Sequence, residues 1–536
     1  DYPKHKLASH ALHYLGVCHM QSEEPDYQAA SKAFARALRN KKYDLREESL
    51  ANHGWCLYAS AGDGADGQPR NPKQLKQAIA TFKTLRKEFP ESRFIDRAIF
   101  YSGEAAFGLD QTKQAIDYYD QLLAMPGIKD SPLRCDALYA RGVAYEQLEK
   151  FDEAFASYKQ LIDQCKDSSL VTDVYVRIGD VQILRKQFEE AIEAFDQALQ
   201  LTKSDDDKSY ALFRQGYAMV QANQPAEAAA KYEQLLEQYP DSRFAMTAVM
   251  ASAQSIYRSG NLEQAAKRFQ RVLDGADRAA ATEAAHWLAR IEIGKSEFDR
   301  AERMVREQIK QGAEGPFAAE LQLDLAEILS MQPDSAAEAM ELFERVYRDN
   351  PKSVVAARAL YNAAFSALQV GQFPKSFQLA SEFLQQYPDD TLNPDVQFIA
   401  AESLLLQREA QPAADRYQKL VRSTAKDNVQ RPIWTLRTAV ALNASQQYQK
   451  TVQFLESEFN SLATNDQKAE AYQLIGRAQI LSGDAARAVE SLQSSIDAAP
   501  DWLGGTQSRL LMGDAYADSG NSQQAISTWD QLIDSD

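Results

Sequence analysis

The chain has 536 residues, of which 76 are acidic and 59 are basic, giving a formal net charge of −17. A negative surface repels phosphate backbones, which argues against nucleic acid as a partner. The composition, 45% hydrophobic and 25% charged, is that of a folded chain rather than a disordered one. The sequence has no run of about 18 apolar residues, the length that would predict a transmembrane helix.

The N-terminal part of the sequence predicts two helical hairpins with irregular spacing. The chain begins at Asp1 instead of Met, so we expect a longer precursor or a cloned fragment. The first hairpin is predicted at about residues 9–40 and the second at about 47–90. A loop insertion over residues 60–72, rich in Gly and Pro, interrupts the second hairpin. Asp63 and Asp66 in this insertion are too few for a calcium loop, so we predict no metal there.

Four of the six histidines lie near the N-terminus, and His10 and His13 are one helical turn apart. A zinc site would need three or four converging ligands, for which Cys18 or His53 would be the candidates. The alternative, which we favour, is a polar and partly exposed first helix. We therefore predict neither a metal nor a cofactor.

From about residue 96 to residue 536 the sequence repeats at a near-constant period. A small residue marks the first helix of each hairpin, and from Gly103 onward the markers are 36 to 39 residues apart. The markers are Gly16, Gly54, Gly103, Gly142, Gly179, Gly216, Ala253, Ala289, Ala326, Ala364, Ala401, Ala439, Gly476 and Gly513. Such a period is typical of stacked repeats, in which each unit needs only its neighbours. We predict one continuous all-α array of about fourteen hairpins over residues 1–536.

The stretch Tyr210–Arg243 shows the hairpin pattern most clearly. Gly216 in its first helix and Ala228 in its second are small enough for two antiparallel helices to approach closely. Tyr232 lies one turn after Ala228 on the buried face. Pro240 ends the hairpin, and we predict that Ser242 caps the next helix.

The same pair of second-helix positions, a small residue and a bulky one four residues later, recurs along the chain. The pairs are Ala115 and Tyr119, Ala154 and Tyr158, Ala191 and Phe195, Ala265 and Phe269, Ala301 and Val305, Ala339 and Phe343, Ala413 and Tyr417, Ala488 and Leu492, and Ala525 and Trp529. Ala380 and Thr451 depart from this pattern, so we expect looser hairpins near Leu360 and Leu436.

This unit resembles the tetratricopeptide repeat, whose pattern has a small residue at position 8, Ala at 20, an aromatic residue at 24 and Pro at 32. The resemblance implies a right-handed superhelical α-solenoid. The longer period, with the connectors FPESRF (Phe89–Phe94) and YPDSRF (Tyr239–Phe244), is similar to a bacterial subgroup. That subgroup includes envelope lipoproteins of outer-membrane assembly and the Tol–Pal coordinator.

In this family the first helices line a concave groove with their positions 2, 5, 9 and 12, and the resemblance implies the same surface here. The apolar residues at these positions are Trp55, Tyr58, Phe100, Phe107, Tyr139, Phe213, Tyr217, Met250, Tyr257, Tyr361 and Phe365. The acidic residues at these positions include Glu104, Asp136 and Asp180. Aromatic anchors rimmed by charge are typical of interface hot spots. The alternative is that several of these aromatics pack against the neighbouring repeat.

The resemblance also bears on the partner. The family's chaperone-tail binders place Lys at position 5 and Asn at position 9, and no repeat here does both. We therefore expect protein or peptide segments with apolar and basic residues as partners.

The sequence predicts a binding scaffold rather than an enzyme. It has no phosphate loop, no dinucleotide fingerprint, no H-E-x-x-H and no G-x-S-x-G. The subgroup resemblance favours a periplasmic or cell-envelope location. The alternatives are a cytoplasmic regulatory adaptor, or the interaction region of a larger enzyme or secretion protein.

Two further features leave alternatives open. Cys135 opens a first helix and Cys165 ends the second helix of the same hairpin, so antiparallel packing could bring them together. We favour two separate thiols; a disulfide would instead indicate an oxidising compartment. The last helix has no polar capping helix behind its apolar face, so we expect either a longer natural chain or self-association through this end.

Overall fold

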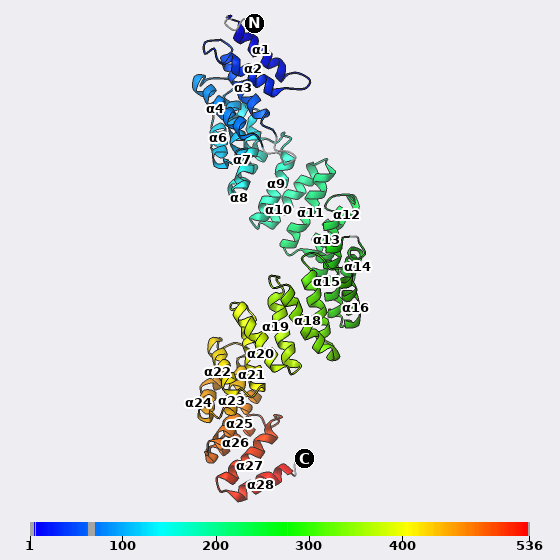
Figure 1. Cartoon of the computed structure of the whole chain (residues 1–536), viewed down its shortest axis with the longest axis vertical. Helices are drawn as coiled ribbons and strands as arrows, with labels where there is room; N and C mark the ends of the chain where they lie inside the picture. The colour runs from blue at the N-terminus through cyan, green and yellow to red at the C-terminus, as the bar shows by residue number, and fades with distance from the viewer. Residues whose placement is uncertain (1–4, 6, 63–69, 276, 534–536) are drawn as a thin grey trace. The chain divides into compact units, whose positions relative to one another are not determined.

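The computed structural model describes residues 5, 7–62, 70–275 and 277–533 of the chain. Within these residues it contains 28 α-helices and three short 3₁₀ turns, Ile128–Asp130, Pro333–Ser335 and Phe459–Ser461. The helices follow one another as antiparallel pairs (Figure 1). The prediction of an all-α array of about fourteen hairpins is confirmed.

By contacts between residues the chain divides into two compact units, Asp1–Arg268 and Phe269–Asp536. The helices that begin in the first unit are α1 (Ala8–Met20), α2 (Tyr27–Ala37), α3 (Arg46–Ala59), α4 (Pro72–Glu88), α5 (Ile95–Phe107), α6 (Thr112–Leu123), α7 (Leu133–Gln147), α8 (Phe151–Gln164), α9 (Val171–Leu184), α10 (Phe188–Leu201), α11 (Asp205–Gln221), α12 (Pro225–Gln238), α13 (Ala245–Arg258) and α14 (Leu262–Leu273). Those of the second unit are α15 (Arg278–Gly294), α16 (Phe298–Lys310), α17 (Ala318–Ser330), α18 (Ala336–Asp349), α19 (Ala356–Gln369), α20 (Phe373–Gln386), α21 (Asn393–Leu406), α22 (Ala410–Ser423), α23 (Arg431–Ala444), α24 (Tyr448–Glu458), α25 (Asn465–Leu481), α26 (Ala485–Ala498), α27 (Gly505–Asp518) and α28 (Ser522–Ile533).

Each hairpin packs a small residue of its first helix against the bulky residue of its second helix. A Cβ atom added to Gly103 would lie 2.5 Å from the ring of Tyr119, and one added to Gly142 would lie 2.3 Å from the ring of Tyr158. The small second-helix positions from Ala115 to Ala525 are all at most 1% exposed. The predicted helix register is therefore confirmed along the chain.

The two hairpins with irregular residues keep this register as well. Ala380 and Thr451 are fully buried, and the hydroxyl of Ser376 donates a hydrogen bond of 2.8 Å to the carbonyl oxygen of Ala364. In the hairpin of α19 and α20 this hydrogen bond satisfies the polar atom that replaces the usual alanine methyl group.

The predicted cap at Ser242 is wrong by two residues. Its hydroxyl accepts a hydrogen bond of 3.2 Å from the amide of Phe244, and helix α13 begins only at Ala245, with Phe244 at its N-cap. The hydroxyl of Ser242 therefore stabilises the turn before the helix, because the chain makes one further bend after Pro240.

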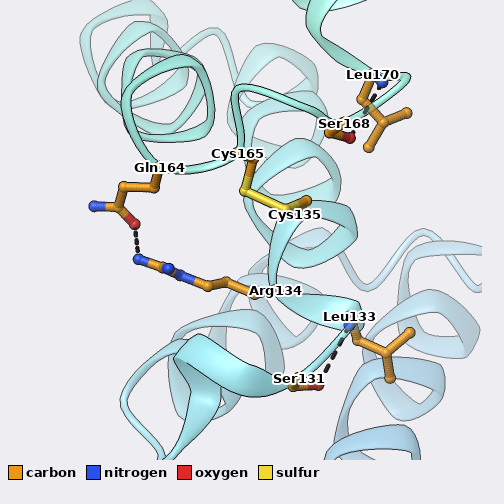
Figure 2. Close-up of a disulfide and its surroundings, with 8 residues drawn as sticks. All are labelled: Ser131, Leu133, Arg134, Cys135, Gln164, Cys165, Ser168 and Leu170. Carbon is orange, nitrogen blue, oxygen red and sulfur yellow. Dashed lines mark hydrogen bonds between the residues drawn. A yellow bond between two sulfur atoms is a disulfide. The ribbon is translucent and has the colours of Figure 1, made fainter.

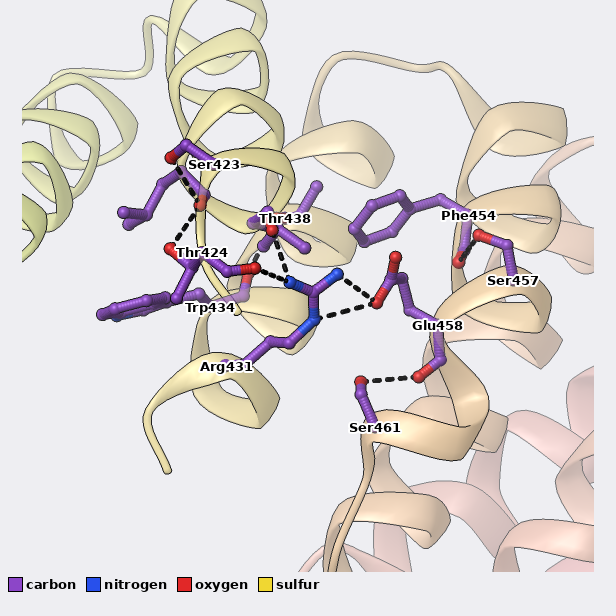
Figure 3. A network of polar contacts seen from close by, with 11 residues as sticks. Ser423, Thr424, Arg431, Trp434, Thr438, Phe454, Ser457, Glu458 and Ser461 are labelled. Atoms are coloured by element: carbon purple, nitrogen blue, oxygen red, sulfur yellow. Dashed lines mark hydrogen bonds and ion pairs between the residues drawn. The ribbon is translucent and has the colours of Figure 1, made fainter. Parts of the chain in front are cut away.

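A buried arginine joins three helices in the second unit (Figure 3). The guanidinium of Arg431, 4% exposed, donates hydrogen bonds of 2.6 Å to the carbonyl oxygens of Val421 and Thr424. It also pairs with Glu458 at 2.9 Å. The last carbonyls of a helix have no partner within the helix, so Arg431 supplies the donors that the end of α22 needs.

The described residues contain no helix that is both long and apolar enough to cross a bilayer. At the C-terminal end, Ile526 and Ile533 of α28 are 51% and 73% exposed. Self-association through this end stays a prediction.

Candidate partner-binding surface

Five of the predicted groove residues line one pocket in the first unit. This pocket, here called the aromatic pocket, has a volume of about 270 Å³. It is lined by Phe100, Glu104, Phe107, Tyr119, Asp136, Tyr139, Ala140, Val143 and Leu170. Helices α5 and α7 supply most of these side chains because both are first helices and contact each other directly.

The aromatic pocket contains two carboxyl groups in largely apolar surroundings. Glu104 accepts a hydrogen bond of 2.6 Å from the hydroxyl of Tyr119. Burial raises the pKa of Glu104 above its ordinary value, against the hydrogen bond from Tyr119, which lowers it. Burial also raises the pKa of Asp136. Both shifts mean that the pocket disfavours a bare negative charge.

A second pocket lies further along the same unit and is mainly polar. This acidic pocket has a volume of about 470 Å³. It is lined by Glu146, Ser169, Thr172, Asp173, Val176, Arg177, Asp180, Asp206, Asp207, Tyr210 and Arg243. Five carboxylates against two arginines leave its lining negatively charged. Of the predicted residues, Asp180 lies here.

Arg177 forms the boundary between the two pockets. Its guanidinium donates to the hydroxyl of Tyr139 at 2.9 Å and to Asp173 at 3.1 Å, and it pairs with Glu146 at 3.3 Å. The same guanidinium lies 5.2 Å from the centre of the Tyr139 ring. Burial raises the pKa of Tyr139 to about 12, so its hydroxyl keeps its proton at neutral pH and donates to Asp173 at 2.6 Å.

The next repeat has the same combination of groups. Arg214 pairs with Asp180 at 2.6 Å, and its guanidinium lies 5.4 Å from the centre of the Tyr217 ring. Tyr210 also donates to Asp180, at 2.8 Å. Successive first helices are therefore joined by ion pairs that run across the surface from one repeat to the next.

Two predicted residues near the start of the chain form a separate aromatic cluster. Trp55 and Tyr58 are half-buried, and their ring centres lie 4.6 and 5.2 Å from that of Tyr101. Tyr58 also donates to Glu104 at 3.4 Å. This cluster lies beside the aromatic pocket because α3 contacts α5 directly.

Other predicted residues contribute more to packing than to an open surface. Phe213 stacks on Phe244 with ring centres 5.5 Å apart, and it also contacts Tyr232. Met250 is 9% exposed. The alternative that some groove aromatics pack against the neighbouring repeat therefore holds for Phe213, and the side chain of Met250 is buried. Tyr217 is more open, at 39% exposure.

The remaining predicted residues lie apart from these pockets. Tyr257 is half-buried on α13. In the second unit, Tyr361 and Phe365 of α19 stack on each other with ring centres 6.3 Å apart, and Phe365 is 41% exposed. That the residues of this set bind a partner stays a prediction.

Sequence reasoning missed the residues two positions before each small marker. Tyr101, Arg177 and Arg214 all precede their marker glycines by two residues, and each contacts groove residues. This shared position is the signal that could have revealed them, since a helix places it on the same face as groove positions 2 and 9. Arg70 was also missed; it follows the insertion and donates to Tyr58 at 3.3 Å.

A disulfide closes the hairpin of α7 and α8 (Figure 2). Cys135 and Cys165 are bonded, with Cα atoms 6.0 Å apart. Of the two alternatives that the sequence left open, the structure has the bridge. Cys165 lies in the turn that leads to Leu170, where the hydroxyl of Ser168 accepts from the amide of Leu170 at 3.2 Å. The disulfide therefore lies in the same apolar cluster as Tyr139, Val143 and Leu170 of the aromatic pocket.

The N-terminal histidines make separate polar contacts. His13 lies 2.7 Å from the hydroxyl of Ser49, and His10 lies 2.7 Å from Asp44. Burial lowers the pKa of His53 to about 4. No group of three or more potential metal ligands is found in the described part of the chain. Asp63 and Asp66 lie outside the described residues.

Comparison with known families agrees with this repeat geometry. Tetratricopeptide repeat profiles match residues 48–92, 102–169, 172–205 and 469–501. A tetratricopeptide repeat-like domain profile matches residues 199–353. The chain is a tetratricopeptide repeat protein. Repeats of this family imply a scaffold for protein–protein interaction, and the first-helix surface described above carries the aromatic pocket and the acidic pocket of this repeat protein.

The solved structures to which this repeat protein is similar share little sequence with it. A chain from the structure of Naa15/Naa10 bound to HypK-THB has 13% identity and a TM-score of 0.39, covering 91% of this chain and 75% of that one. A tetratricopeptide repeat protein from Parabacteroides merdae has 14% identity and a TM-score of 0.33, covering 53% and 99%. The APC/C hetero-tetramer Cut9–Hcn1 has 14% identity and a TM-score of 0.31, covering 95% and 96%. No curated protein matches the sequence.

Proposed function

We propose that this repeat protein is a non-enzymatic scaffold that holds a segment of a partner protein along the first-helix surface of its first unit. The observation that carries the proposal is the succession of an aromatic pocket and an acidic pocket on helices α5 to α11. Aromatic anchors beside charged groups are the usual basis of binding hot spots. The negative lining favours a segment that combines apolar and basic residues.

Selection from a displayed library of random 16-residue peptides on the immobilised full chain tests this proposal. We expect the enriched peptides to combine Arg or Lys with apolar residues. Their affinities would then be measured by fluorescence anisotropy against the wild type and two charge-reversal variants.

Asp206→Lys changes an exposed carboxylate of the acidic pocket at the second residue of α11. Glu189→Lys makes the same charge change at the second residue of α10, an exposed position outside both pockets. We expect Asp206→Lys to weaken peptide binding about tenfold or more, since like charges brought together cost several kcal/mol, and Glu189→Lys to leave it nearly unchanged. Equal effects of the two variants would refute the proposed surface.

We further propose that the protein works in an oxidising compartment, as part of a cell-envelope assembly or trafficking complex. The disulfide between Cys135 and Cys165 supports this, because such bonds persist in oxidising compartments and are rare in the cytosol. The connectors Phe89–Phe94 and Tyr239–Phe244 support the envelope context by their resemblance to bacterial envelope repeats.

Thiol labelling in the native cell tests the compartment. Cells would be quenched with acid, and the unfolded protein treated with a maleimide reagent that adds mass to each free thiol. We expect Cys18 and Cys56 to react, and Cys135 and Cys165 to react only after reduction. Labelling of all four cysteines without reduction would place the protein in a reducing compartment.

A further inference from the structure

The aromatic pocket has the size of a site for one side chain. Its volume of about 270 Å³ is below the roughly 300–1,000 Å³ that is typical of pockets for small-molecule ligands. Phe100 and Phe107 come from α5, Tyr139 and Val143 come from α7, and Leu170 precedes α9. A long, partly apolar side chain would contact all three segments.

The pocket also holds a carboxyl group that the chain itself leaves unpaired. In the part of the chain that the structure describes, Asp136 makes neither a hydrogen bond nor an ion pair. No Lys or Arg is among the residues that line the pocket. Burial raises the pKa of both Asp136 and Glu104, and a cation placed between these carboxyl groups would offset that cost.

Neighbouring carboxylates on the same surface show what such a group pairs with. Arg177 pairs with Asp173 and Glu146 while it lies over the ring of Tyr139. Arg214 does the same with Asp180 and the ring of Tyr217. In both cases a guanidinium group meets a carboxylate on one side and a tyrosine ring on another. The aromatic pocket offers carboxyl groups and aromatic rings with no Arg or Lys among its lining residues, while Arg177 lies over the outer pocket residue Tyr139 and Arg70 acts on Glu104 from outside the lining.

We propose that the aromatic pocket binds the side chain of one arginine from the partner segment. The arginine stem would lie along Phe107 and Val143, and its guanidinium would reach Asp136 and Glu104. Arginine fits better than lysine because its planar, weakly hydrated head stacks on aromatic rings and pairs with carboxylates through two donors at once. This inference rests on the proposed function, which places a partner segment on this surface.

A titration with small amides tests the pocket without a selected peptide. The probes are N-acetyl-arginine amide, its neutral analogue N-acetyl-citrulline amide, and N-acetyl-norleucine amide, followed by ligand-observed NMR against the full chain. We expect saturable binding of the arginine probe, with citrulline about tenfold weaker, because hydrogen bonds to charged groups are the stronger ones.

Two variants of the pocket and one control complete the test. We expect Asp136→Asn and Glu104→Gln each to weaken the arginine probe several-fold, and Glu189→Gln on α10 to leave it unchanged. Glu104→Gln keeps an acceptor for the hydroxyl of Tyr119, and circular dichroism melting would verify that both variants fold.

Three results would overturn the inference. They are no saturable binding of the arginine probe to the wild type, equal binding of the norleucine probe, or arginine binding that neither pocket variant changes. In each case the affinities of the selected peptides for the wild type and for Asp206→Lys still test the proposed function separately.

Discussion

At the residue scale, several first helices bring a glycine directly against a ring of the second helix. A Cβ atom on Gly142 would lie 2.3 Å from the ring of Tyr158. That ring is held in place, because the Tyr158 hydroxyl donates to Glu146 and the side chain is fully buried. We expect Gly142→Ala to lower the free energy of unfolding by about 1–3 kcal/mol, as overpacking does, measured by urea titration.

The matched control is the same substitution at Gly294, near the end of α15. No atom lies within 4 Å of a Cβ placed there. Alanine favours helix by up to about 1 kcal/mol over glycine, so Gly294→Ala should stabilise the chain or leave it unchanged. If Gly142→Ala behaved like this control, the close contact with Tyr158 would not be real.

Glu104 gives the first unit a pH dependence whose sign follows from its surroundings. Burial raises its pKa above the ordinary value of 4.5. Below pH 4.5 the carboxyl is protonated in both the folded and the unfolded chain. Between 4.5 and the raised pKa only the folded chain keeps the proton, so stability falls as pH rises through this window and stays reduced above it.

We therefore expect Glu104→Gln to be more stable than the wild type at pH 7.5 but not at pH 4. The comparison is made by urea titration at both pH values. Glu189→Gln, an exposed control on α10, should follow the wild type at both. A wild type that gained stability relative to Glu104→Gln as pH rose would show that the carboxylate is favoured in the fold.

At the scale of the element, the hairpin of α7 and α8 carries a covalent link that the other hairpins of the described chain lack. The bonded cysteines are 30 residues apart, and a loop of this length predicts a stabilisation of about 3–4 kcal/mol from the restricted unfolded state. We expect a reductant to speed hydrogen exchange in α7 and α8 of the wild type. In Cys135→Ser/Cys165→Ser it should change nothing.

Cys18→Ser serves as the control, because Cys18 is exposed and forms no disulfide. That variant should keep the full response to reductant. Exchange in α7 and α8 that is slow and indifferent to reductant in the wild type would mean that the bridge does not constrain this hairpin.

The hairpins themselves could be predicted from the sequence, because their register depends on local spacing. The interval between Gly216, Ala228 and Tyr232 fixes which faces meet, and helical geometry alone requires this. The sequence predicts that the two cysteines could lie close together, but it does not show whether they form a disulfide, since a disulfide and two separate thiols fit the same spacing. Ser242 was misplaced because the exact turn after Pro240 depends on contacts that the periodicity does not encode.

The candidate surface was predicted only in part, because tertiary contacts decide which aromatics stay open. Tyr139 lines a pocket and is half-buried, whereas Phe213 is covered by Phe244 from the following turn. Both kinds occupy equivalent positions in their repeats. Ion pairs such as that between Arg214 and Asp180 were missed because they link two repeats, and a pattern read within one repeat does not show its neighbour.

At the scale of the whole molecule, the net charge of −17 and the acidic pocket act on the same step of binding. Long-range attraction speeds the encounter with a basic segment, and salt screens it, since the Debye length falls from about 10 Å at 0.1 M to about 3 Å at 1 M ionic strength. We expect the association rate of a selected basic peptide to fall about tenfold over this range, with a smaller change in dissociation. Stopped-flow fluorescence would measure both rates.

Asp206→Lys should reduce the salt dependence more than Glu189→Lys, although both change the net charge equally, because only Asp206 lies in the acidic pocket. Salt that acted mainly on dissociation would show that short-range contacts, rather than the field of this surface, select the partner.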